Sequence, residues 1–397
     1  MYWRNAELAA AMLADPLVNS TVGTWLEQRA FITHAVESLP RGTPLAAALA
    51  RELAALAAPP APPPPPPASR SVQPGEDVPC GDMTLRVGGD GGLHSLRRGG
   101  AEWASPERPL MRPWYQGYDH AHFHRFAENY TGGISRVWIE ATMINLVKPL
   151  MLLDAIRSGM RVEAVHAGEA RGEARGEGEG EHVVDVVVID MVIASREAHE
   201  QRGAPARMQA RMRCDRRDAG RIDYTLLWFN KTATHVPETI WLTNQPAPRA
   251  TKVLIDKLGA QVDAEDVDLH CDGYAMTCGV HLHAVGDAGA TYVADTGRLR
   301  IASLDSALLS VGPVEGLPTP LVAPDIQGGL HWSLVNNLWN TNYPVWYPFL
   351  AADSASQFRF SLALEGAAQP RERSSAEPRQ QGGLAPALRQ GDRAQWS

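Results

Sequence analysis

Six consecutive prolines at positions 62–67 divide the chain into two parts with different hydrophobic patterns. Proline fixes its own backbone φ angle and lacks an N–H group, so such a run cannot continue a helix or pair inside a sheet. It instead adopts a stiff, extended polyproline II conformation that suits a spacer. We therefore predict a proline-rich linker over residues 58–80. A ligand for a proline-binding domain is the alternative interpretation.

The part before the prolines, residues 1–57, has the apolar spacing of helices. Thr21 is a residue type that caps helices, and apolar residues recur at near-helical spacing from position 22 to position 39. A second helix is predicted after Thr43, with Pro44 at its first helical position. These helices have too little core to stand alone. We expect them to be the end of something larger, or a small bundle docked on the next domain.

The part after the prolines has the pattern of short strands separated by turns. Residues 84–87 and 93–96 flank a glycine-rich turn and predict a hairpin. Further runs rich in β-branched residues lie at 182–193, 206–214, 222–229 and 240–243. Short strands with turn signals predict a mainly-β sandwich domain over residues 81–366.

Two stretches have compositions that do not suit a packed core. Residues 163–181 consist largely of Gly, Glu and Arg, which predicts a disordered insertion between two strands. Residues 367–397 are charged and aperiodic, which predicts a disordered tail.

Charge and hydropathy exclude several classes of partner. The net charge of −8 and the pI of about 5.9 argue against nucleic acid as a partner. The longest apolar run, residues 146–153, contains Lys148 and Pro149 and is too short to span a bilayer. No apolar segment typical of a signal peptide follows Met1, and three Asn-x-Ser/Thr triplets are weak signs of secretion, so the compartment stays open.

The four cysteines are Cys80, Cys214, Cys271 and Cys278, and no two have the Cys-x-x-Cys spacing of a zinc or redox site. For Cys271 and Cys278 we leave a disulfide and buried thiols open, and we predict no metal site. The sequence has no dinucleotide fingerprint, phosphate loop, nucleophile elbow or zinc-protease motif, so no catalytic residue is assigned.

Residues 328–349 combine three tryptophans with four asparagines, a density found nowhere else in the chain. Aromatic faces stack on the C–H face of a sugar, and asparagine amides both donate and accept hydrogen bonds. We therefore predict carbohydrate-binding residues here. The alternative is that the tryptophans fill a core while the asparagines close turns. The candidates are His331, Trp332, Asn336, Asn337, Trp339, Asn340, Tyr343 and Trp346.

Several segments resemble a known family in their order and spacing. They are TWLEQRAFITHAVESLP (24–40), PWYQGYDHAHFHRFAENY (113–130), VPETIWL (236–242), SLDSALLSVG (303–312) and GGLHWSLVNNLWNTNYPVWY (328–347). Together they look like the C-terminal half of domain of unknown function family 5054. Its members are similar, at a distance, to the α-mannosidases of glycoside hydrolase family 38.

This resemblance implies that the catalytic groups lie in a different domain from the sandwich. In family 38 a zinc ion and an aspartate nucleophile lie in an N-terminal domain, and a galactose-mutarotase-like sandwich packs on that domain. The resemblance therefore assigns no residue of this sequence as the nucleophile or as a zinc ligand. It also implies that the chain itself holds no cofactor, zinc belonging to the catalytic domain of full-length relatives.

We therefore expect a galactose-mutarotase-like sandwich, preceded by a short helical segment, that contacts carbohydrate and lacks its catalytic zinc domain. The carboxylates nearest the segments above, those of Asp119, Glu238, Asp305 and Asp325, are not recognisably paired as a glycosidase requires. The chain alone should then not hydrolyse glycosides. A stand-alone carbohydrate-binding module and a structural sandwich without a ligand are the alternatives, and the oligomeric state is left open.

Overall fold

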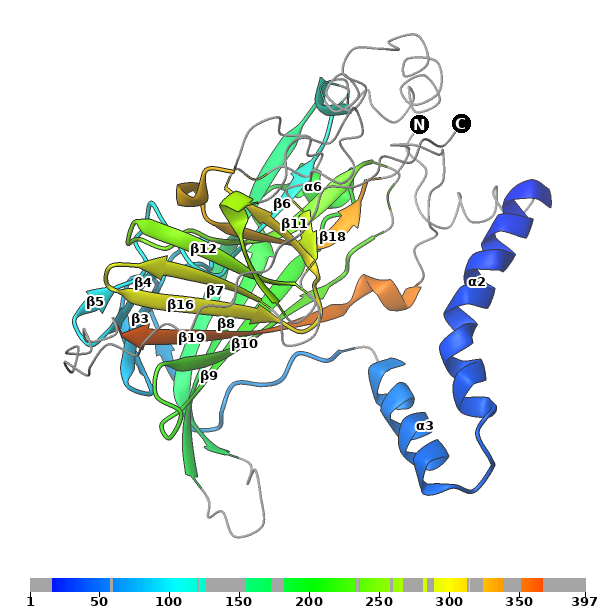
Figure 1. Ribbon diagram of the computed structural model, residues 1–397, viewed down its shortest axis with the longest axis horizontal. Helices are drawn as coiled ribbons and strands as arrows, with labels where there is room; N and C mark the ends of the chain where they lie inside the picture. The colour runs from blue at the N-terminus through cyan, green and yellow to red at the C-terminus, as the bar shows by residue number, and fades with distance from the viewer. Residues whose placement is uncertain are drawn as a thin grey trace, which may run out of the picture. The chain divides into compact units, whose positions relative to one another are not determined.

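The structure of the protein is a computed structural model (Figure 1). It describes residues 16–57, 60–119, 121–123, 125, 154–172, 182–232, 234, 236–257, 260–266, 281–283, 289–312, 314, 324–338 and 351–366.

In the described part of the chain, two helices precede the prolines: α2 (Pro16–Glu37) and α3 (Pro44–Ala57). The hydroxyl of Thr43 accepts a hydrogen bond from the Ala46 N–H (3.3 Å), so the predicted start of the second helix is confirmed. The predicted start of the first helix is wrong, because α2 begins at Pro16, whose fixed φ suits a first helical position, and Thr21 lies inside it. Among the described helices, none is long and apolar enough to cross a membrane.

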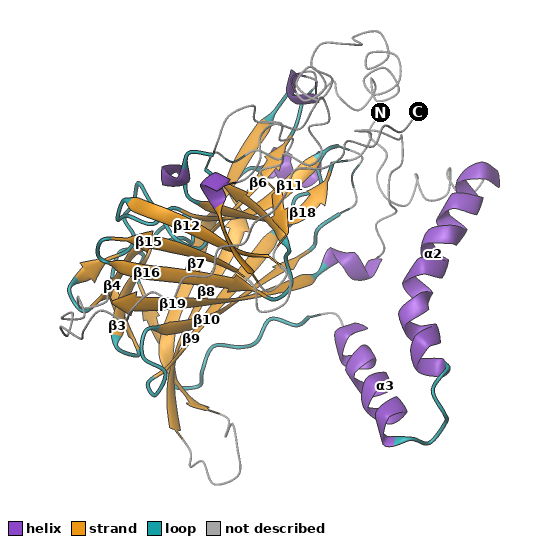
Figure 2. Ribbon diagram, in the orientation of Figure 1, coloured by secondary structure: helices purple, strands orange, loops and turns teal. Residues whose placement is uncertain are grey.

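The described strands form two antiparallel sheets, drawn in orange in Figure 2. The smaller has the order β2 (Asp77–Cys80), β3 (Met83–Val87), β4 (Leu93–Arg98) and β5 (Ala101–Glu102). Its β3–β4 pair confirms the predicted hairpin, with Leu85 opposite Leu96.

The larger sheet has 15 strands within the described residues. Its order is β13 (Ala260–Asp263), β12 (Ala250–Lys257), β15 (Gly289–Ala294), β16 (Gly297–Ser303), β19 (Ser356–Gly366), β10 (Arg221–Phe229), β9 (Arg207–Asp215), β8 (His182–Ile193), β7 (Ile156–Gly172), β6 (Arg112–Gly117), β11 (Glu238–Asn244), β18 (Leu330–Asn337), β17 (Leu308–Val311) and β14 (His281–His283), with β1 (Arg70–Val72) paired to β7. Short helical turns, such as α6 (Arg196–Glu200), connect some of them.

The large sheet folds back on itself. Six strands separate β18 from β19 in the sheet order, yet the rings of Trp332 and Phe360 meet edge to face at 5.8 Å. In Figure 1, β16 and β19 pass in front of the long β7 and β8 strands. One contiguous cluster of buried apolar side chains includes residues from all of these strands. The fold is therefore mainly β, as the sequence predicts.

Two predicted boundaries need correction. Strand β7 continues to Gly172, through the first part of the stretch predicted to be disordered, while residues 173–181 lie outside the described part. Val165 and Ala167 are buried, and β7 pairs with both β8 and β1, so partner strands stabilise a segment whose composition alone would not. The predicted linker is likewise shorter, because β1 and β2 lie within its last residues.

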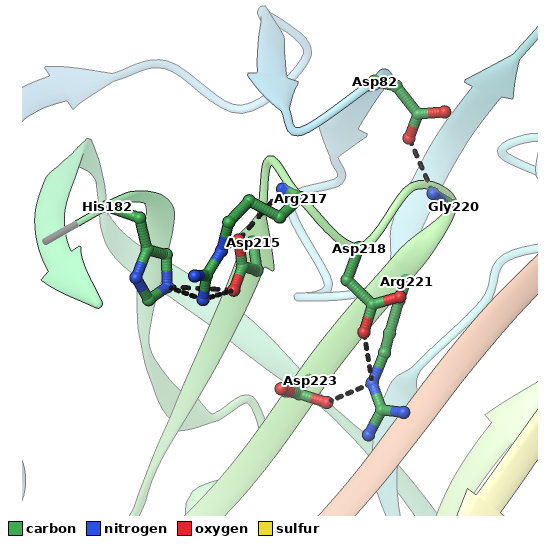
Figure 3. A network of polar contacts seen from close by, with 8 residues as sticks. All are labelled: Asp82, His182, Asp215, Arg217, Asp218, Gly220, Arg221 and Asp223. Atoms are coloured by element: carbon green, nitrogen blue, oxygen red, sulfur yellow. Dashed lines mark hydrogen bonds and ion pairs between the residues drawn. The ribbon is translucent and has the colours of Figure 1, made fainter. Parts of the chain in front are cut away.

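A disulfide between Cys80 and Cys214 joins the small sheet to β9, with Cα atoms 5.3 Å apart. Sequence analysis missed this pair, and Cys271 and Cys278, the pair it considered, lie outside the described residues. Beside the disulfide, Asp82 accepts a hydrogen bond from the Gly220 N–H (2.7 Å; Figure 3). In the same network Arg217 donates to Asp215, which lowers the pKa of Asp215 to about 2. The two sheets are thus joined covalently and by hydrogen bonds.

We predict that replacing both Cys80 and Cys214 with Ala lowers the free energy of unfolding by about 2–5 kcal/mol, since the bond closes a long loop in the unfolded chain. Urea denaturation of the two proteins measures this difference. A reducing agent should destabilise the wild type and leave the double variant unchanged. Equal sensitivity of both proteins to the reducing agent would contradict the prediction.

Candidate functional site

The segments that carry the family resemblance come together in one part of the large sheet. Strands β6, β11, β18 and β17 lie side by side in that order, although they are far apart in the sequence. Trp241 of β11 is opposite Trp114 of β6 on one side and Ser333 of β18 on the other. The pairing of β11 with β18 slips between Ile240 and Trp241, which leaves Leu334 as an extra, bulged residue.

One face of these strands carries a buried aromatic and polar cluster. The rings of Trp114 and Trp241 are stacked with centroids 6.2 Å apart. The Trp241 Nε1–H donates to the side-chain oxygen of Gln116 (3.0 Å), to which the hydroxyl of Tyr118 also donates (3.2 Å). Sequence analysis named none of these residues as candidates, although Trp114, Gln116 and Trp241 alternate along strands in the pattern of a single face.

His331 continues this face of the sheet and is buried. Its Nε2 lies 2.9 Å from the Gly312 carbonyl, so this nitrogen carries the proton, and Nδ1 accepts from the Thr243 hydroxyl (3.1 Å). Thr243 in turn accepts from the Trp114 Nε1–H (2.7 Å). Burial lowers the pKa of His331 to about 4, so the ring is neutral at pH 7.

The opposite face of β18 points into the core. Trp332 has 0% of its surface exposed and packs on Phe360, so its ring cannot stack on a sugar in this structure. His331 and Trp332 therefore act as core residues, which is the alternative interpretation of the aromatic segment. Asn336 is exposed and Asn337 is half-buried at the end of the strand. The other candidates, Trp339, Asn340, Tyr343 and Trp346, lie outside the described residues.

A cavity of about 350 Å³ opens where β10 and β18 end and where β11 and β19 begin. Its apolar wall includes Trp228 and Phe358, whose ring centroids are 4.7 Å apart. Its polar lining includes Lys231, Glu238, Asn336, Asn337 and Asp353. This cavity brings two of the predicted asparagines together with groups that the sequence did not link to them.

Lys231 and Glu238 form a buried ion pair at this cavity. The Lys231 Nζ lies 2.5 Å from Glu238 Oε1, and 2% and 1% of their side chains are exposed. Nζ also donates to the carbonyls of Gly203 (3.2 Å) and Thr232 (3.3 Å). Burial raises the pKa of Glu238, while the charge of Lys231 opposes that rise. A buried lysine with these partners is held in one position.

Two residues that line the cavity, Trp228 and Glu238, each have a buried side-chain atom without a hydrogen-bond partner in the described part of the chain. Asn337 Nδ2 donates to the Thr234 carbonyl (3.1 Å) and approaches Glu238 Oε1 (3.5 Å). Tyr115 is close enough to affect the pKa of Glu238, but its hydroxyl donates to the Arg202 carbonyl (3.1 Å). Within the described residues, Glu238 Oε2 and the Trp228 Nε1–H therefore have no hydrogen-bond partner. Such buried atoms are costly unless something else binds them.

The other carboxylates named from the sequence have structural roles. Asp305 forms a two-point ion pair with Arg359, with its closest contact at 2.7 Å. Asp325 accepts from the Gln327 N–H at the start of a short helical turn (3.0 Å). Asp119 accepts from the His122 N–H (3.0 Å). Lys231 was missed, because no periodic pattern joins a turn lysine to a glutamate seven positions later.

The described residues do not supply a zinc site. No three of their His, Cys, Asp and Glu side chains are grouped to hold a metal ion. The side chains of His281 and His283, and all of Cys271 and Cys278, lie outside the described part. The donor set of the cavity, a lysine, amides and an ion-paired carboxylate, does not suit zinc.

We predict that Lys231→Met destabilises the fold by about 3–5 kcal/mol, because it leaves the buried Glu238 carboxylate without its cation. The double variant Lys231→Met/Glu238→Leu should recover most of this loss. Chemical denaturation gives both values. As a control, Arg196→Ala breaks an exposed ion pair with Glu200 and should cost less than about 1 kcal/mol. If Lys231→Met loses as little stability as Arg196→Ala does, Lys231 and Glu238 do not form a buried ion pair.

We also predict that His331 makes stability depend on pH. The unfolded chain binds a proton at this histidine near pH 6.5, whereas the folded chain binds it only near pH 4. As the pH falls from 6.5 to 4, the free energy of unfolding of the wild type should therefore fall by about 3 kcal/mol more than that of a His331→Gln variant. Denaturation curves of both proteins at several pH values measure it. If the stabilities of the two proteins change in parallel with pH, His331 is not a buried, neutral histidine in the folded state.

The chain was compared with known proteins. The family described as Domain of unknown function (DUF5054) matches residues 2–221. No curated protein matches the chain.

Three solved structures are similar at low identity. An α-mannosidase from Enterococcus faecalis V583 is 11% identical with a TM-score of 0.41 over 76% of this chain and 30% of its own. A protein in the glycosyl hydrolase family 38 from Enterococcus faecalis is 10% identical, with a TM-score of 0.39. The match covers 76% of this chain and 31% of that protein. A galactose 1-epimerase from Lactobacillus acidophilus NCFM is 11% identical, with a TM-score of 0.31. The match covers 72% of this chain and 92% of the epimerase.

With TM-scores below 0.5, these similarities assign neither a substrate nor a mechanism to this chain. The chain spans less than a third of the length of the two Enterococcus proteins. The family match covers more than half of the 397 residues, so the chain belongs to the DUF5054 family.

Proposed function

We propose that this chain is the carbohydrate-contacting β-sandwich region of a glycoside-hydrolase-like protein. The cavity at Lys231, Glu238, Asn336 and Asn337 is then its sugar-contacting site. The observation that carries the proposal is the meeting, in one cavity, of an aromatic wall with amide, ammonium and carboxylate groups.

The chemistry of a sugar suits this lining. Each sugar hydroxyl both donates and accepts hydrogen bonds, and an asparagine side chain offers both functions. Glu238 Oε2 is a free acceptor and the Trp228 Nε1–H is a free donor. Both atoms are buried, and a hydroxyl group that reached either one would satisfy it. The cavity is at the small end of the usual range for ligand sites, about 300–1,000 Å³, so a single sugar unit is the proposed ligand.

The proposed contacts differ from those expected from the aromatic segment alone. Asn336 and Asn337 stay as sugar-contacting residues, whereas His331 and Trp332 stabilise the sheet beneath them. Contacts from Trp339, Asn340, Tyr343 and Trp346 remain predictions.

We further propose that this chain does not hydrolyse glycosides by itself. Retaining glycosidases use two carboxyl groups about 5 Å apart, one of which must be free to transfer a proton. Glu238 is held in a buried ion pair with Lys231, which does not suit that task. Bond cleavage would then depend on residues of another domain, where the zinc ion of the related glycosidases belongs.

We predict that methyl glycosides of mannose, galactose or glucose bind the purified chain and that Asn336→Ala weakens binding about five- to tenfold, as the loss of one or two hydrogen bonds would. Saturation-transfer NMR and calorimetry measure the binding. Glu200→Gln, on α6, should leave affinity unchanged.

Two results would count against the proposal. If none of the glycosides binds, the chain is a structural sandwich without a sugar ligand. If a glycoside binds equally well to the wild type and to Asn336→Ala, its site lies elsewhere. Hydrolysis of aryl glycosides by the purified chain would overturn the proposed dependence on another domain.

A further inference from the structure

Asn230 follows the last residue of β10 and points into solvent. Its φ angle of 58° lies in the left-handed region, which asparagine enters more readily than most other residues. No hydrogen bond joins its side chain to another residue in the described part of the chain. The amide is therefore accessible.

The residues after Asn230 hold the backbone in place. The Lys231 N–H donates to the Ser354 carbonyl (3.0 Å) and the Thr232 N–H to the Gly203 carbonyl (3.3 Å). The Lys231 side chain points inward to Glu238, while Thr232 is exposed. The chain thus presents Asn230 on a fixed turn, with the bulk of the protein behind it.

Asn230, Lys231 and Thr232 have the Asn-x-Ser/Thr pattern of an N-glycosylation acceptor. Such triplets also arise by chance, so the pattern alone decides nothing. The structure adds that Asn230 and Thr232 are both exposed, in the segment that connects β10 to β11. Asn19, another triplet, lies within helix α2, and Asn129 is outside the described residues.

An independent observation concerns the compartment. The disulfide between Cys80 and Cys214 is fully buried and joins two sheets. Disulfides form and persist mainly in oxidising compartments such as the lumen of the secretory pathway. N-linked glycans are attached in that same compartment, so the disulfide and the acceptor triplet point to one environment.

We propose that Asn230 is an N-glycosylation site and that the chain folds in the secretory pathway. The glycan donor is a lipid-linked oligosaccharide pyrophosphate. The Asn230 Nδ2 forms a bond to C1 of the first sugar, the bond from C1 to the pyrophosphate oxygen breaks, and the lipid pyrophosphate leaves. The displaced amide proton goes to a base of the transferase, and no electrons are transferred.

The test is expression of all 397 residues behind a heterologous secretion signal in a eukaryotic host. Peptide N-glycosidase treatment in heavy-oxygen water converts each glycosylated Asn to a labelled Asp, which mass spectrometry of the disulfide-bonded protein identifies. Asn230 is expected to carry the label. Thr232→Ser keeps the acceptor pattern and should keep the label.

Two variants remove the pattern in different ways. Asn230→Asp keeps a residue that tolerates the positive φ angle, and Thr232→Ala leaves Asn230 itself in place. Both should lose the glycan at this position completely while keeping the Cys80–Cys214 bond.

Two results would overturn the proposal. One is an unlabelled Asn230 in the disulfide-bonded wild-type protein, taken from the medium or from the endoplasmic reticulum. The other is a wild-type protein that keeps Cys80 and Cys214 as free thiols in the secretory pathway. Neither result depends on whether the cavity binds sugar.

Discussion

One face of the large sheet carries a long row of apolar side chains, and the need to bury that row is the constraint on which the rest of the structure depends. On β19, Phe358, Phe360, Leu362 and Leu364 are buried while the residues between them are not. A single open sheet would leave this row in water, so the strands fold back until β18 lies across from β19. This packing brings the ends of β10 and β18 near the starts of β11 and β19, where the cavity opens.

Local signals in the sequence predicted local structure well. Thr43 with Pro44 marked the start of a helix, and the glycine-rich turn before Leu93 marked a hairpin. Both depend on residues that are neighbours in the chain. The mainly-β class followed from the same kind of signal, repeated strand by strand.

Features that depend on distant partners could not be predicted in the same way. Strand β7 passes through a stretch of low-complexity composition because β8 and β1 pair with it. Cys80 and Cys214 are 134 positions apart and carry no spacing signal. Trp332 is a different case. It lies two positions after Leu330, so in a strand both side chains share one face, and both are buried. This two-residue period could have placed Trp332 in the core rather than at a sugar.

The disulfide between Cys80 and Cys214 also changes the connectivity of the molecule. The backbone between the two cysteines becomes a closed covalent ring that includes β3 to β8 and most of β9. A protease that cuts once anywhere in this ring opens it without releasing a fragment. The two new ends then stay attached through sulfur until a reductant separates them. A nicked chain would keep every residue of the intact one and gain only one water molecule, so the two fragments would separate only after reduction.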